Sequence, residues 1–91
     1  MANRPDPTVT VIIPDLARRH DGRWYLDTKT TTGLTEVYRA WSSPVHVVAR
    51  ASDRILPPGP NFSEASFHRT PITLTITENV IQTVARIGSD I

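Results

Sequence analysis

Histidine and carboxylate side chains are the residues of this chain that could hold a metal ion or exchange protons. The three histidines, His20, His46 and His68, lie far apart in the chain. A tetrahedral metal site would need the fold to bring them together with a carboxylate such as Asp15 or Asp21. Nothing in the spacing favours this, so the sequence predicts no metal site.

No nucleophile stands in a pattern that would activate it. The chain has no cysteine, which excludes thiolate catalysis, disulfides and zinc-finger ligation. No serine occupies a Gly-x-Ser-x-Gly turn, and no glycine-rich loop precedes a helix to cradle a phosphate. The acidic residues are scattered and read as a solvated surface. We therefore expect neither a catalytic residue nor a cofactor, and hence no enzyme.

Charge is nearly balanced, with ten basic and nine acidic residues and a formal net charge of +1. This balance provides no electrostatic footprint for nucleic acid or for an anionic membrane. No apolar run approaches the roughly 20 residues that span a bilayer. The opening Met-Ala-Asn-Arg-Pro-Asp-Pro lacks the apolar core of a secretory signal. We expect a soluble protein that is cytoplasmic at synthesis and binds neither nucleic acid nor membrane.

Arginine, aromatic and proline residues are the side chains best suited to contact a protein partner. Arg and aromatic residues are enriched at protein interfaces, and prolines hold a segment extended. If Tyr25 and Trp41 shared one exposed face, they would also suit a carbohydrate. The candidate partner contacts are Arg4, Pro5, Pro7, Tyr25, Trp41, Leu56, Pro57, Pro58, Pro60 and Phe62.

The elements that must position these residues are organised around the stretch from Pro71 to Gly88. Its first half alternates apolar and threonine side chains. A period of two with many β-branched residues indicates a strand that buries one face and exposes the other. The apolar positions are Ile72, Leu74 and Ile76, and the polar ones are Thr73, Thr75 and Thr77.

Three further runs of β-branched and aromatic residues predict strands over 8–13, 23–28 and 45–50. In each run, alternate residues lie on one face of the strand. Val9, Val11 and Ile13 share a face in the first run, and Trp24 and Leu26 lie opposite Tyr25 in the second. In the third run, Val45, Val47 and Ala49 are expected to face inward.

Proline and glycine mark the connections between these strands. Pro14 is expected to end the first strand and to precede one helical turn over 15–20. Asp21-Gly22 is a turn signal. Residues 29–33 are expected to form a loop in which Gly33 adopts a positive φ.

Two segments carry patterns that fit either a strand or a helix. Residues 34–41 have apolar side chains at helical spacing but consist largely of strand formers, and the strand is favoured. Residues 80–87 are predicted to return antiparallel to 72–77 after a two-residue turn at Glu78-Asn79. A helix is the alternative there, because Val80, Val84 and Ile87 are helically spaced.

Together these elements predict a mainly β protein, a small antiparallel sandwich or barrel of about five to six strands with at most one or two short helices. The alternative is an α+β fold with helices over 33–42 and 79–87. Residues 1–7 are expected to form an extended N-terminal arm. Residues 8–91 are expected to form a single β-rich domain with a Pro-rich loop at 55–70.

The lack of catalytic residues, the extended Pro-rich segments and the Thr-rich strands favour a non-catalytic subunit of a larger assembly, such as a capsid-decoration or tail component of a virion. Strand edges and Pro-rich segments would contact other protein subunits in a homo- or hetero-oligomer. The alternatives are a small inhibitor or immunity-type module that binds a protein, and a carbohydrate-binding module that uses exposed aromatic residues.

Overall fold

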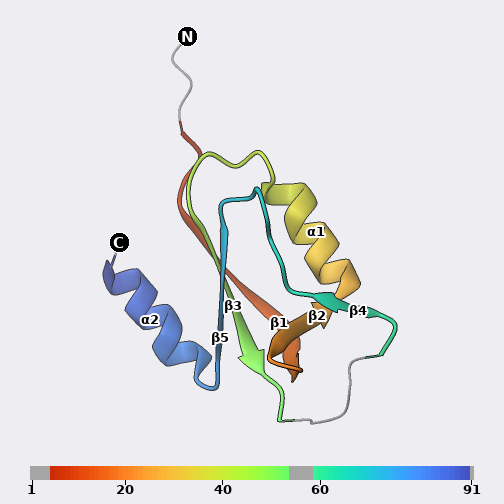
Figure 1. Cartoon of the computed structure of the whole chain (residues 1–91). Helices are drawn as coiled ribbons and strands as arrows, with labels where there is room; N and C mark the ends of the chain where they lie inside the picture. Colours follow the sequence, from red (N-terminus) through yellow and green to blue (C-terminus); the bar gives the residue numbers. More distant parts are fainter. Residues whose placement is uncertain (1–4, 54–58, 91) are drawn as a thin grey trace.

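The computed structural model describes residues 5–53 and 59–90, over which the chain forms five strands and two helices (Figure 1). The elements follow one another in an order that mixes strands with helices. They are β1 Val9–His20, β2 Arg23–Asp27, α1 Thr28–Tyr38, β3 Val45–Ala51, β4 Phe62–Glu64, β5 Ile72–Thr77 and α2 Val80–Asp90.

The five strands form one open sheet in the order β4-β2-β1-β3-β5. β1, β3 and β5 run parallel, whereas β2 is antiparallel to both β1 and β4. The prediction of a mainly β protein is confirmed. The expected antiparallel sandwich or barrel is wrong, because there is one sheet and β3 pairs in parallel with β1 and β5. The connections between these strands return the chain to the same end of the sheet, so the strands run in the same direction.

Rows of apolar side chains cross the three parallel strands on one face of the sheet. The β3 members of these rows are fully buried, and they form the core with residues of β1, β2 and α1. The shared face predicted for Val9, Val11 and Ile13 and the inward face predicted for Val45, Val47 and Ala49 are therefore confirmed. The rows are Val9–Val45–Ile72 and Val11–Val47–Leu74, with Ala49 beside Ile76 at the end.

β1 continues through Pro14 rather than ending there. The pairing of β1 with β3 is irregular between Ile12 and Leu16, and Pro14 lies inside this irregularity. A proline there removes no regular ladder hydrogen bond, which is why a central strand tolerates it. The helical turn predicted over 15–20 is wrong, because this segment supplies the half of β1 that pairs with β2.

The turn predicted at Asp21-Gly22 joins β1 to β2. Asp21 has a φ of 52° and Gly22 a φ of 75°. Two consecutive positive φ angles define the two-residue turn whose twist matches an antiparallel hairpin. Gly33, for which a positive φ was expected, instead lies within α1 and has a negative φ.

α1 replaces both the loop predicted over 29–33 and the strand favoured for 34–41. Asp27 caps the helix, since its carboxylate accepts a hydrogen bond from the Lys29 N–H at 2.9 Å. Two threonines bond back onto the helix, with Thr35 Oγ1 donating to the Thr31 carbonyl at 2.8 Å. These local bonds and the packing of Leu34 on the core outweigh the strand propensity of threonine.

α2 replaces the return strand predicted over 80–87. Its first turn is capped by Asn79, whose Oδ1 accepts a hydrogen bond from Gln82 N–H at 3.0 Å. The helix packs over β3 on the face opposite the core, where Val48 is 0% exposed. Figure 1 shows α1 and α2 on opposite sides of the sheet. The gain from covering this face outweighs the low helix propensity of the β-branched residues in α2.

The stretch expected to be one long loop over 55–70 contains the short strand β4, which pairs with β2 from Asp27–Phe62 to Tyr25–Glu64. Phe67 and Ala65 beyond it pack against the core. None of the helices in the described residues is both long and apolar enough to cross a bilayer.

Substitution of the most deeply buried large side chain tests this architecture. Leu26 is 0% exposed, so Leu26→Ala is expected to lower the free energy of unfolding by about 2–5 kcal/mol. Val37 on α1 is 63% exposed, and Val37→Ala should change stability by less than about 0.5 kcal/mol. Denaturant unfolding followed by circular dichroism measures both, and equal losses would contradict the assigned core.

Candidate functional site

The first described residues of the N-terminal arm are bound to the chain's own α1–β3 connection. The Asp6 carboxylate accepts a hydrogen bond from Ser42 N–H at 3.0 Å, and Asp6 N–H donates to Ser42 Oγ at 2.6 Å. Trp41 Nε1 donates to the Pro7 carbonyl at 2.8 Å. The candidate contacts Pro5 and Pro7 are exposed at this anchored segment, whereas Arg4 lies outside the described residues.

The two aromatic candidates Tyr25 and Trp41 do not share a face. Trp41 packs edge-on against Tyr38, with ring centroids 5.3 Å apart, and belongs to the partly buried layer around the core. Tyr25 alternates with the core residues Trp24 and Leu26 on β2, so its side chain lies on the opposite face of the sheet. The flat aromatic patch that a carbohydrate would need is not formed by this pair.

The remaining described candidates gather around β2 and β4. The Arg18 guanidinium lies over the Phe62 ring, 4.6 Å from its centroid, and the His20 ring is 6.4 Å from that of Tyr25. Pro60 is exposed in the turn before β4. These contacts hold the aromatic rings against their own chain. The candidates Leu56, Pro57 and Pro58 lie outside the described residues.

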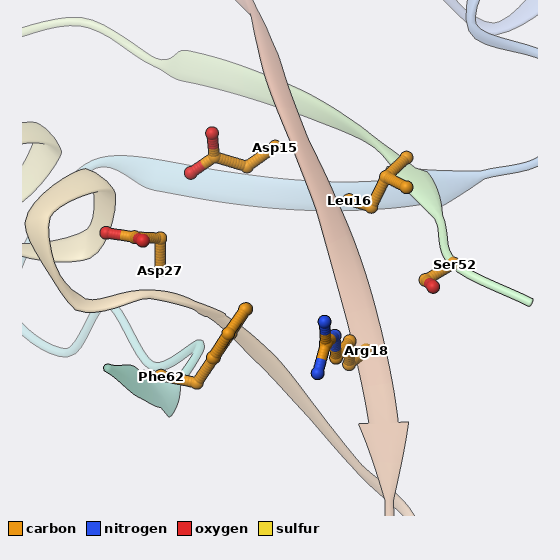
Figure 2. Close-up of a pocket in the computed structure, with 6 residues that line it drawn as sticks. All are labelled: Asp15, Leu16, Arg18, Asp27, Ser52 and Phe62. Atoms are coloured by element: carbon orange, nitrogen blue, oxygen red, sulfur yellow. The ribbon is translucent and has the colours of Figure 1, made fainter. Parts of the chain in front are cut away.

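A shallow cleft of about 350 Å³ opens where β1, β2 and β4 meet the end of β3. Figure 2 shows the carboxylates of Asp15 and Asp27 on the side of the cleft nearest α1, with Arg18 and the Phe62 ring next to each other. The full lining is Asp15, Leu16, Arg18, Asp27, Ser52 and Phe62. The sequence pattern does not predict that these residues meet, because the irregularity in β1 that places Asp15 there has no local signal.

Both carboxylates in this cleft serve the start of α1. Asp27 caps the helix, and Asp15 accepts a hydrogen bond from the Thr30 hydroxyl. Each acid is thus engaged by a donor from the helix. The described residues contain no group of three His, Asp or Glu side chains placed to hold a metal ion. The two carboxylates of the cleft therefore have a structural use.

The outer edge of β5 is an edge of the sheet with which no segment of the described chain pairs. Val45 N–H donates to the Pro71 carbonyl at 3.0 Å. In the regular register of the parallel pair, this one bond fixes which residues of β5 point their backbone N–H and C=O groups toward β3 and which point them away. Neighbouring residues of a strand point their N–H and C=O groups to opposite sides. Thr73 and Thr75 therefore bond toward β3, and the residues between them point outward.

Three residues present these outward groups, namely Ile72, Leu74 and Ile76. The Ile72 N–H donates to Thr70 Oγ1 across a long 3.3 Å. No backbone hydrogen bond joins Leu74 or Ile76 to another segment beyond the β3 side among the described residues. The sequence pattern did not predict this edge, because the hairpin predicted with 80–87 would have covered it.

The cleft assignment is tested by the cap on α1. Asp27→Ala should remove the hydrogen bond to Lys29 N–H and lower the free energy of unfolding by about 1 kcal/mol. Asp27→Asn keeps a side-chain oxygen at the cap and should cost less than about 0.5 kcal/mol. Thermal and denaturant unfolding measure both, and an equal loss from the two variants would show that the charge, not the cap, matters.

Comparison of the chain with models of protein families, with curated proteins and with solved structures found no match. The fold by itself implies no function, because one fold hosts many activities. The geometry offers an open strand edge, a shallow cleft whose carboxylates hold α1, and aromatic rings packed on their own chain.

Proposed function

We propose that this chain is a non-catalytic interaction subunit whose β5 edge accepts a strand from another protein in a larger assembly. The observation that supports the proposal is the outward row of backbone groups along Ile72–Thr77. An added strand would bond to these groups as β3 does on the other side.

The composition of β5 lacks the features that protect a free edge. Edge strands are commonly kept apart by charged side chains, prolines, bulges or very short length. β5 carries six residues with no charge and no proline, in regular register with β3. The opposite edge, β4, has three residues and ends in Glu64, which forms a 3.5 Å ion pair with Arg23. One edge is thus guarded and the other is open.

The side chains of β5 also favour a neighbour. Ile72, Leu74 and Ile76 lie on the core face but remain only partly buried, since they pack on β3 from one side. A strand added at the edge would cover part of that remaining apolar surface. Burial of apolar area stabilises an association by about 25 cal/mol per Å² before the costs of association.

A lysine on the edge strand tests the proposal. In extracts of the cells that produce it, the wild-type chain is expected to migrate in a complex well above its 10.1 kDa. Thr73→Lys places a charge beside the open edge and should return the chain to its monomer size, as read by native gel filtration with immunodetection.

The matched control is Thr10→Lys. Thr10 is exposed and lies in the same cross-strand row as Thr73, but on the interior strand β1. This variant should remain in the complex. A wild-type chain that migrates as a monomer, or a complex that survives Thr73→Lys, would refute the proposed function.

A further inference from the structure

We infer that the strand accepted by β5 is β5 of a second copy of this chain, paired antiparallel about a two-fold axis at Leu74. The inference rests on the proposed function and names its partner. Closed two-fold dimers are the commonest symmetric oligomers, and their interface must be complementary to itself.

The sequence of β5 has this self-complementarity. Residues 72–76 read Ile-Thr-Leu-Thr-Ile, which is the same in both directions. An antiparallel pair centred on Leu74 sets Ile72 opposite Ile76 of the second copy and Thr73 opposite its Thr75. Apolar side chains then meet on the core face and threonines on the other, both of which are favourable cross-strand pairs.

The backbone selects the same register. Opposite residues in an antiparallel pair exchange hydrogen bonds only if both point their N–H and C=O groups toward each other. An axis at Leu74 pairs all three outward residues: Leu74 lies opposite Leu74 of the second copy, and Ile72 lies opposite its Ile76. An axis at Thr75 would also align outward groups, but it sets Ile72 against Glu78, which lies beyond the end of the strand.

The helices leave this edge accessible. α2 packs over β3 rather than beside β5, and α1 contacts β2 and β4 at the other end of the sheet. Two copies can therefore join edge to edge into one continuous sheet. The apolar rows through Val45 and Val47 would then extend through Ile72 and Leu74 into the second copy.

Two variants of opposite charge, studied alone and mixed, test whether the partner is a second copy of this chain. One chain carries Thr73→Lys and Thr75→Lys, and the other carries Thr73→Glu and Thr75→Glu. Each variant alone sets like charges opposite each other and should dimerise about tenfold more weakly than the wild type, or worse. An equimolar mixture should restore the dimer, as read by light scattering across a concentration series.

Cysteine pairs test the register, and the chain has no native cysteine to interfere. Residues 73 and 75 of two copies form a non-hydrogen-bonded pair with Cα atoms about 4.5 Å apart, within reach of a disulfide. Residue 73 and its own copy stand about 7–8 Å apart, which is too far. A mixture of Thr73→Cys with Thr75→Cys should therefore cross-link under mild oxidation, and neither variant should cross-link alone.

A mixture of Thr10→Cys with Thr75→Cys is the control and should stay uncross-linked. Cross-linking of Thr75→Cys by itself would overturn the axis at Leu74. A wild-type chain that stays monomeric at every concentration would overturn the second copy as partner. If the purified wild-type chain stayed monomeric but Thr73→Lys still released it from its cellular complex, the proposed function would stand and only the second copy as partner would be refuted.

Discussion

Pairing of β3 with a parallel strand on each side is the constraint on which the rest of the structure depends. β3 alternates its hydrogen bonds, so that Val45 bonds to β5 while its neighbours bond to β1. Its side chains are buried on both faces, with Val45 and Val47 in the core and Val48 on the face over which α2 packs. A strand buried on both faces must be central and must have helices or loops above and below it. The places of β1, β5 and α2 follow from this.

The same constraint leaves β5 with one free side. Thr73 and Thr75 direct their backbone hydrogen bonds to β3, so the backbone N–H and C=O groups of Leu74 point outward. α2 packs over β3 and does not occupy this edge. The alternation that makes residues 72–77 a strand also makes their free edge regular, uncharged and self-complementary. Under the proposed function, the side-chain pattern that serves folding on one side would also serve recognition on the other.

Side chains that looked available for a partner are engaged within the chain. Trp41 packs on Tyr38 and bonds to the N-terminal arm, and the Phe62 ring lies under Arg18. The carboxylates of the cleft hold the first turn of α1. In a chain of 91 residues the core is small, so aromatic and polar groups are needed to fix loops and helix ends. The proposed function therefore assigns recognition to the backbone.

The sequence by itself determined the features that arise from neighbours in the chain. The alternation in 72–77 and 45–50 and the Asp21-Gly22 turn predict what the structure shows, because each depends on local sterics and on one buried face. The tertiary structure alone decided the character of 80–87 and 34–41, whose β-branched residues suit a helix or a strand until packing chooses. It also decided the parallel order of the strands. The open edge that carries the proposed function exists only because residues 80–87 form a helix that packs over β3, instead of a strand beside Leu74.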